Sequence, residues 1–175
     1  MKSSFFYNFF EKIRINECIK YCQGRILDIG CGNNNLVKKY GNGVGVDIYP
    51  WEGVDIVCDT TNLPFKENEF DRVFLIACLN HIPERAKVLK EAFRVLKPEG
   101  MIIITMIGPK IGFLVHKISF FFGEQDQRIR GMKEGEVYGM SQKEADDLLT
   151  QAEFKDIYHK KFELGLNKFF FGKKI

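Results

Sequence analysis

The sequence lacks the features that mark secreted and membrane-spanning proteins. Its five cysteines are odd in number and lie in the first half of the chain, which favours reduced thiols in a cytoplasmic protein over a disulfide framework. The apolar run near the N-terminus is interrupted by Asn8 and ends at Glu11, unlike a signal sequence. The run from Phe113 to Phe122 contains Lys117 and is too short to cross a bilayer. We therefore expect a cytoplasmic protein with no transmembrane segment.

An excess of charge of one sign is also missing. The chain has 26 basic and 23 acidic residues, a formal net charge of +3, and both signs are mixed along the sequence. This distribution gives no reason to expect a nucleic-acid partner. The chain has 175 residues, of which 45% are hydrophobic, so it can bury a sizeable core but has little room for a second one. We predict one domain over residues 1–175.

Apolar segments alternate with helical patterns along the chain, which predicts an α/β fold. Several of these segments are nearly continuous apolar runs, typical of parallel strands that are buried on both faces. The last two predicted strands are separated only by a short turn and indicate an antiparallel hairpin at the C-terminal edge. The prediction is a doubly wound, mostly parallel seven-stranded sheet with helices on both faces. The predicted strands are 25–29, 43–48, 54–58, 70–77, 101–107, 154–162 and 166–171.

Four helices are expected between these strands. The first, over about residues 4–21, has an aromatic face, and the last begins with a capping-box pattern at Ser141 and Glu144. The other two are a brief helix around Leu36 and one opened by Pro83, where proline is well tolerated. Residues 108–140 are expected to be irregular and, in so small a domain, to carry function.

Glycines and acidic residues follow the carboxyl ends of the first three predicted strands. Ligands of open α/β sheets bind at this edge. Gly30 and Gly32 let the backbone approach a ligand closely, and Asp28 precedes them. Asp47 ends the second strand at the spacing at which a carboxylate accepts hydrogen bonds from ribose hydroxyls, and Asp59 is placed to accept from an adenine amino group. Together these residues predict a nucleoside site.

Two nucleoside cofactors can be compared on the glycine loop. The dinucleotide fingerprint needs a glycine where this chain has Asn35, whose side chain would crowd the helix against the strand, and this counts against NAD. The run DIGCGNN, from Asp28 to Asn34, instead resembles the acid-x-Gly-x-Gly-x-Gly motif of the S-adenosylmethionine-dependent methyltransferases with a Rossmann-like sheet. Asn34 takes the place of the last glycine, and asparagine tolerates the left-handed conformation well.

Four further segments are similar to motifs of the same family, and they follow one another in the expected order. GVDI at 45–48 resembles the second-strand motif, and CDTTNLPF at 58–65 resembles the third. FDRV at 70–73 and LKPEG at 96–100 resemble the start of the fourth strand and the turn before the fifth. The five motifs extend over about Arg25 to Ile107 and are together far more specific than one glycine loop.

The resemblance implies a role for each matched position. The implied cofactor is S-adenosylmethionine, which leaves as S-adenosylhomocysteine. Asp28, Gly30 and Gly32 would line its methionyl part. The other implied contacts are Asp47 with the ribose, Ile48 with one face of adenine, Asp59 and Thr60 at the adenine amino group, and the backbone near Ala77 with the methionyl amine.

The implied reaction is transfer of a methyl group to a small-molecule or lipid-like acceptor by direct in-line displacement, which depends mainly on positioning. His81, just past the fourth strand, is the candidate general base for an acceptor that arrives protonated. A histidine that only shapes the pocket at the entry of a helix is the alternative. The segment 112–123 is expected to cap the acceptor pocket, while contact with lipid or burial in the core are the other interpretations. A second hypothesis is a non-catalytic subunit, because so short a chain has little with which to build an acceptor pocket.

Other residues are assigned structural roles. Cys31, Cys58 and Cys78 lack the close spacing of a zinc knuckle, so no metal site is predicted. Cys18 and Cys22 are expected to face the core, and Asp71 to stabilise a turn. The segment after the fourth strand has neither an Asn-Pro-Pro-Tyr motif nor a Pro-Cys pair, which lowers the expectation of a nucleic-acid base as acceptor.

Overall fold

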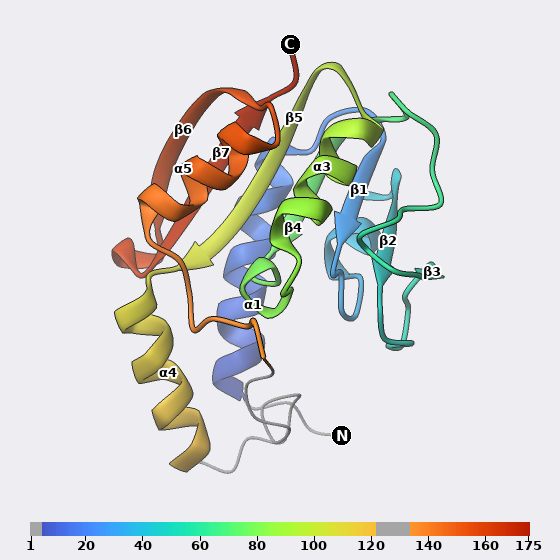
Figure 1. Ribbon diagram of the computed structural model, residues 1–175. Coiled ribbons are helices and arrows are strands. Elements are labelled where there is room, and N and C mark those ends of the chain that lie inside the picture. The colour runs from blue at the N-terminus through green and yellow to red at the C-terminus, as the bar shows by residue number, and fades with distance from the viewer. Residues whose placement is uncertain (1–4, 122–133) are drawn as a thin grey trace.

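The computed structural model describes residues 5–121 and 134–175, which form a seven-stranded sheet between layers of helices (Figure 1). The strand order is β3-β2-β1-β4-β5-β7-β6. The first five strands in this order are parallel, and β7 is antiparallel to both β5 and β6, as the sequence predicts. The strands are β1 Ile26–Ile29, β2 Gly43–Asp47, β3 Ile56–Val57, β4 Phe70–Ile76, β5 Leu96–Ile107, β6 Lys155–Phe162 and β7 Asn167–Lys173.

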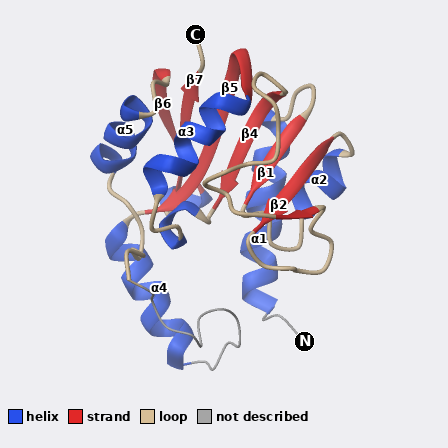
Figure 2. Ribbon diagram, turned by 45° about the vertical axis from the view of Figure 1, so that its right-hand side comes forward, coloured by secondary structure: helices blue, strands red, loops and turns tan. Residues whose placement is uncertain are grey.

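Helices cover both faces of the sheet (Figure 2). One face carries α3 (Arg85–Val95) and α5 (Gln142–Gln151), and the other carries α1 (Phe5–Cys18) and α2 (Asn35–Tyr40). The capping box predicted for α5 is present, with the Ser141 side chain accepting from the Glu144 backbone. Short 3-10 turns are η1 (Ile19–Tyr21), η2 (Leu79–His81) and η4 (Glu163–Gly165). Of the aromatic face predicted for α1, the side chains of residues 5–9 lie outside what the structure describes.

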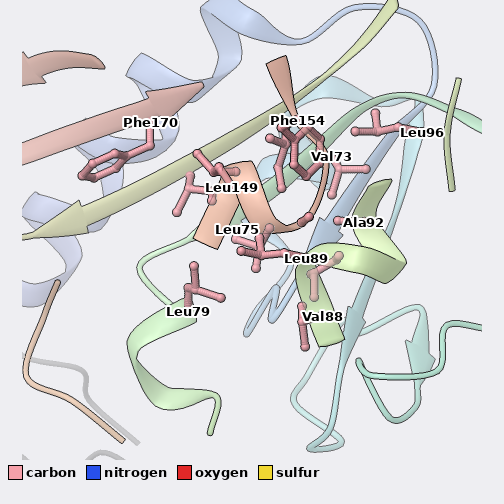
Figure 3. Close-up of a cluster of buried hydrophobic side chains, with 14 of the residues drawn as sticks. Val73, Leu75, Leu79, Val88, Leu89, Ala92, Leu96, Leu149, Phe154 and Phe170 are labelled. Carbon is pink, nitrogen blue, oxygen red and sulfur yellow. The ribbon is translucent and has the colours of Figure 1, made fainter. Parts of the chain in front are cut away.

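The core has two parts, one on each face of the sheet. Figure 3 shows Leu89 of α3 and Leu149 of α5 beside Val73 and Leu75 of β4. Phe74, between those two strand residues, is buried in the other part, against side chains of α1 and α2. Successive side chains of a strand point to opposite faces, so a central strand covered on both sides must be apolar at every position. This explains why β4 reads as an almost continuous apolar run.

The strand β5 begins earlier than predicted, at Leu96 instead of Met101. Its pairing with β4 passes from Leu96 opposite Phe70 directly to Met101 opposite Arg72, so the residues between them bulge out of the ladder. Glu99 has a positive φ of 66° in this bulge, and its backbone N–H donates to the Lys174 carbonyl. The predicted turn at 97–100 is therefore a bulge within the strand.

The prediction that residues 108–140 are irregular is wrong in part, because Pro109–Phe121 form a helix, α4. Proline at the first helical position is favourable, and one glycine inside a helix costs only about 1 kcal/mol, so Gly112 does not stop it. Gly112 is instead needed for packing, since a Cβ there would lie 1.9 Å from the Tyr138 carbonyl oxygen. Residues 122–133 lie outside the described structure. None of the helices in the described ranges has the length and apolar character needed to cross a membrane.

Asp71 ties together the amino ends of three neighbouring strands. Its Oδ2 accepts the Arg25 backbone N–H at 2.8 Å, and the Lys97 ammonium lies 2.9 Å from both carboxylate oxygens. Burial opposes ionisation of this carboxyl, but the hydrogen bonds from Lys97 and Arg25 outweigh it and lower the pKa of Asp71 below its usual value. This agrees with the structural role expected from the sequence.

We predict that Asp71→Asn lowers the free energy of unfolding by about 1–2 kcal/mol at neutral pH. The folded-state pKa is depressed, so the stabilisation is present above the unfolded-state pKa and is lost as the pH falls through the folded-state pKa. Urea denaturation of both proteins at several pH values measures this. Asp147→Asn, which removes only an exposed ion pair with Lys143, is the control and should change stability by less than about 0.5 kcal/mol. Equal losses in the two variants would contradict the role of Asp71.

Candidate functional site

The candidate site lies at the edge of the sheet where β1, β2, β4 and β5 end (Figure 1). The loop after β1 is tied to the end of β2 by three backbone donors. Gly30 and Cys31 donate to the Val46 carbonyl at 2.8 and 3.0 Å, and Gly32 donates to Asp47 Oδ2 at 3.0 Å. The parallel pairing of β1 with β2 thus continues into the loop and fixes it next to the Asp47 carboxylate.

The two loop glycines are required for different reasons. Both have positive φ, 70° at Gly30 and 52° at Gly32, where most side chains are strained. A Cβ at Gly30 would lie 2.8 Å from the Cys78 Cβ, so this glycine also permits close packing. A Cβ at Gly32 would meet no atom within 4 Å. The backbone at Gly32 therefore borders open space.

Asp28 is a buried acid at the start of this loop. It is 2% exposed, and its Oδ1 has no hydrogen-bond partner. Burial, and secondarily the nearby Asp47 carboxylate, raises the pKa of Asp28 to about 8. A buried carboxylate oxygen without a partner is unfavourable in its charged form. A cation or a hydrogen-bond donor that binds beside Asp28 Oδ1 would therefore stabilise the ionised carboxylate.

The Asp47 carboxylate accepts hydrogen bonds from the backbone of two segments, the glycine loop and the connection after β2. Its Oδ2 accepts from Gly32, and its Oδ1 accepts from the Tyr49 backbone at 3.0 Å. Each carboxylate oxygen has a second lone pair that remains able to accept from hydroxyl groups. The next residue, Ile48, is 60% exposed, which is unusual for so large an apolar side chain. A carboxylate beside an exposed apolar side chain suits a sugar attached to a flat aromatic ring.

The third predicted acid lies close to the second through the sheet. The Cys58 backbone donates to the Asp47 carbonyl at 3.0 Å, and Asp59 and Thr60 follow. Asp59 Oδ1 accepts from the backbone and hydroxyl of Thr61, both at 2.8 Å, and these bonds lower the pKa of Asp59. Asp59 is exposed, whereas Thr60 is buried. The structure thus brings the three predicted acids to one edge, with Asp59 at its periphery.

The end of β4 closes the site on the side opposite β2. Ala77 has a φ of 52°, and its N–H donates to the backbone and hydroxyl oxygens of Thr105, both at 3.1 Å. The Cys78 thiol donates to the Ile29 carbonyl at 3.1 Å. A non-glycine residue held in the left-handed region costs free energy that the surrounding contacts must offset. The chain is thereby forced to turn away from the sheet beside the glycine loop.

His81 lies in η2, directly after this turn, and faces a residue from beyond α4. Its Nδ1 is 3.8 Å from Glu136 Oε2, and the Glu136 side chain is only 3% exposed. The Val137 backbone donates to the Asn80 carbonyl at 2.9 Å, which places residues 134–140 along η2. The distance is too long for a hydrogen bond but short enough for an ion pair when the imidazole is protonated.

Three residues of the site were missed from the sequence. Thr105 had a usable signal, because it is a polar residue within the apolar run of β5, and it is fully buried. Glu136 had none, since only tertiary contacts bring it to His81. Asp55 precedes β3, and its carboxylate binds the Asn34 side chain and the Gly45 backbone. The sequence placed it inside the predicted strand 54–58, where nothing marked it as a residue of the site, whereas β3 begins only at Ile56.

The cysteines at this edge are poor nucleophiles. All five cysteines of the chain are free. Burial raises the pKa of Cys31 and of Cys78 above the usual thiol value, and the Asp28 carboxyl adds to the effect. These thiols therefore stay protonated at neutral pH, and protonated thiols attack electrophiles slowly. Among the described residues no group of three or more His, Cys, Asp or Glu side chains is arranged to hold a metal.

Residues 27–104 match the family model described as a methyltransferase domain. A ubiquinone/menaquinone biosynthesis C-methyltransferase from Desulfotalea psychrophila is 29% identical over 140 residues, which cover 73% of this chain and 54% of the relative. Several curated relatives are longer proteins, and the chain spans 30%, 66% and 54% of the length of three of them.

Solved structures share the fold. The crystal structure of an S-adenosylmethionine-dependent methyltransferase from Thermotoga maritima matches with a TM-score of 0.73 at 19% identity and covers 97% of both chains. Phosphoethanolamine N-methyltransferase 2 of Haemonchus contortus, solved with phosphomonomethylethanolamine and S-adenosylhomocysteine, matches with a TM-score of 0.65 at 19% identity, over 93% of this chain and 53% of that one. Residues 27–104, which contain all five motifs, are thus similar to a methyltransferase domain, in agreement with the resemblance to the S-adenosylmethionine-dependent methyltransferases, and the solved structures confirm the predicted Rossmann-like fold.

Proposed function

We propose that this protein binds S-adenosylmethionine at the edge described above and transfers its methyl group to a small-molecule acceptor. The observation that carries the proposal is the loop after β1, which has open space at Gly32, a bond from Gly32 to the Asp47 carboxylate, and at its start the buried Asp28 carboxyl with its unpartnered oxygen. These features fit a cofactor with a positive charge at one end and a ribose at the other. The donor and acceptor groups are those expected from the motif resemblance, and the fold agrees with it.

The chain's own residues would hold the two halves of the cofactor separately. The Gly30 and Gly32 backbone would border the methionyl half, with Asp28 as the nearby acid and the carbonyl region of Ala77 near the amine. Asp47 would accept from the ribose hydroxyls, with Ile48 against adenine and Asp59 and Thr60 at its amino group. When bound, the cofactor supplies an electrophilic methyl group on a sulfonium leaving group. Positioning the acceptor in line with that methyl group is then the main task of the protein.

His81 and Glu136 supply the proton acceptor in this proposal. An acceptor that arrives as a hydroxyl or an ammonium must lose a proton, and a neutral imidazole is a suitable base. Once protonated, the ring of His81 would be stabilised by the Glu136 carboxylate at 3.8 Å. The pair lies beside Ala77, at the side of the site away from the ribose acid Asp47.

The acceptor would enter between η2 and α4. Phe113 and Leu114 of α4 are more than half exposed, and the ring of Phe113 meets the ring of Tyr138 edge-on at 5.4 Å. Figure 1 shows α4 projecting from the edge of the sheet that holds the site. These side chains would give the acceptor pocket an apolar wall. The names of the relatives, which include enzymes of quinone and phosphoethanolamine methylation, support a small-molecule or lipid-like acceptor.

Calorimetric titration with S-adenosylhomocysteine tests the cofactor site directly. We expect saturable binding by the wild-type protein and a loss of about 1–3 kcal/mol of binding free energy in Asp47→Ala, because the ribose hydroxyls lose their acceptor. Asp147→Ala, an exposed acid on α5, is the control and should bind as the wild type does. Folded wild-type protein that shows no heat at millimolar ligand would refute the proposal, and binding without turnover would favour a non-catalytic subunit.

Asp28→Asn should have opposite effects on binding and on stability. The folded-state pKa of about 8 lies above the usual 3.8, so the folded protein binds the proton more tightly than the unfolded chain does. Stability therefore falls as the pH rises between these values, by up to about 4 kcal/mol at pH 7. The side chain of the variant cannot ionise. The thermal midpoint of the variant minus that of the wild type should therefore increase as the pH rises from about 5 to about 9.

The same variant should bind S-adenosylmethionine more weakly, because it cannot supply a negative charge near the cationic half of the cofactor. Thermal unfolding across pH and calorimetry at one pH give the two readouts. A variant that is equally destabilised relative to the wild type at every pH, or that binds the cofactor unchanged, would contradict the role given to Asp28.

His81→Asn should reduce methyl transfer by about a hundredfold while leaving S-adenosylhomocysteine binding unchanged. Tritiated methyl transfer to phosphoethanolamine and to a demethylmenaquinone analogue measures turnover. Glu136→Gln should give a smaller loss and a shifted pH profile, since it keeps the shape but removes the charge that stabilises the protonated ring. His159→Asn is the matched control, because His159 pairs with Asp146 at 2.6 Å away from the site. Full turnover by His81→Asn would contradict the role of His81 as general base and would leave it only the role of shaping the pocket.

A further inference from the structure

Asn34 occupies the place of the last glycine in the loop, and the nitrogen of its side-chain amide is bonded, whereas the buried Oδ1 has no hydrogen-bond partner. The residue has a left-handed backbone conformation, φ 59° and ψ 35°, and is 1% exposed. Its Nδ2 donates to the Gly53 carbonyl at 3.0 Å and to Asp55 Oδ2 at 2.8 Å. The same carboxylate oxygen accepts the Gly45 backbone N–H at 2.7 Å. One amide therefore joins the glycine loop, β2 and the connection between β2 and β3.

Gly45 provides the space for this amide. A Cβ at Gly45 would lie 2.1 Å from Asn34 Oδ1, and the three nearest atoms would all belong to the Asn34 side chain. Gly45 does not have a positive φ, so its backbone conformation is open to other residues. The glycine is thus required for the contact with Asn34. The side chain of Asn34 in the loop therefore fits only because Gly45 in β2 has no side chain.

The bonds of Asn34 add a second link between the glycine loop and the connection 48–55, because the Asp47 carboxylate already joins Gly32 to Tyr49 at the near end of that connection. The bonds of Gly30, Cys31 and Gly32 hold the loop to the last residues of β2. The bonds of Asn34 hold it to residues 53–55, at the far end of the connection that begins with Ile48 and carries the paired rings of Tyr49 and Trp51. The Asn34 side chain therefore holds the far end of this connection to the loop, while Asp47 holds the near end.

We propose that Asn34 is a positioning residue, which sets the distance between the glycine loop and the connection 48–55 and so determines how well the adenosine half of the cofactor fits. This inference rests on the proposed function. A glycine at this position would keep the backbone conformation, because glycine adopts positive φ freely, but it would release the connection. The asparagine is therefore a functional replacement for the motif glycine in this chain, with Gly45 and Asp55 as its partners.

Asn34→Gly tests the inference, because it gives the loop the glycine that the family motif has. We expect it to weaken binding of S-adenosylhomocysteine and of 5′-methylthioadenosine by the same factor, about tenfold, since both ligands contain the adenosine half. The matched control is Asn33→Gly, the exposed neighbour in the same run of asparagines, which should change both affinities less than about twofold. A variant with a lowered thermal midpoint but unchanged affinities would mean that Asn34 only stabilises the fold, and would overturn the inference.

Gly45→Ala provides a second, independent test through coupling. Alone it should weaken both ligands and lower the thermal midpoint, because its Cβ collides with Asn34. Combined with Asn34→Gly it should cost little further, since the colliding side chain is gone, so the two effects should be far from additive. Additive losses would overturn the inference. Wild-type protein that binds neither ligand would refute the proposed function itself, whereas wild-type binding that Asn34→Gly leaves intact would refute only the role of Asn34.

Discussion

The hydrogen bonds from the glycine loop to the end of β2 are the constraint on which the rest of the site depends. Because β1 and β2 are parallel neighbours, Ile29 lies opposite Val46, and the next two N–H groups of the loop continue the ladder onto the Val46 carbonyl. The following donor, on Gly32, reaches the Asp47 carboxylate. The register of two buried strands therefore fixes where the loop lies relative to the ribose acid. From Gly30 to Gly32 the loop is placed by its backbone donors, and this suits a ligand that must be approached by backbone.

Electrostatics at this edge work against the stability of the fold. Asp28 is buried beside Asp47, and its pKa is raised to about 8, so its ionisation opposes folding at neutral pH. The same environment keeps the thiols of Cys31 and Cys78 protonated. The proposed sulfonium ligand would benefit in two ways, since an acid is available for a cation and nearby sulfur is held in its less nucleophilic form. The chain as a whole is weakly basic, with a net charge of +3, so this local acidity is a property of the site and not of the surface in general.

Local patterns in the sequence were sufficient for the sheet, for its C-terminal hairpin and for the acids at the strand ends. Each of these follows from continuous apolar runs and from the rule that parallel strands end at one edge. The helix α4 was not predicted, and its Gly112 makes a tertiary contact that no local pattern reports, because the residue must be small to admit the Tyr138 backbone. Glu136 was missed for a related reason: a contact between segments far apart in the chain places it beside His81. Asn34 was recognised as tolerating the left-handed conformation, but its bonds to Gly53 and Asp55 depend on how the loop folds back onto the sheet.

The two halves of the site are built in different ways, and this bears on how an acceptor is selected. In the proposed function the cofactor half uses residues 28–60, which are close in sequence and held by the strand ladder. The acceptor half is assembled when residues 134–140 dock along η2, where Val137 bonds to Asn80 and the Gly135 carbonyl accepts from Arg85. The close approach of Gly112 to Tyr138 then sets α4 against the same segment. At its end the segment joins the core, where Met140 is buried, but none of the contacts just named involves β1, β2 or the glycine loop. Substitutions in this segment can therefore alter the acceptor pocket without disturbing the cofactor loop, whereas a change at Asn34 or Asp47 acts on the cofactor whatever the acceptor is.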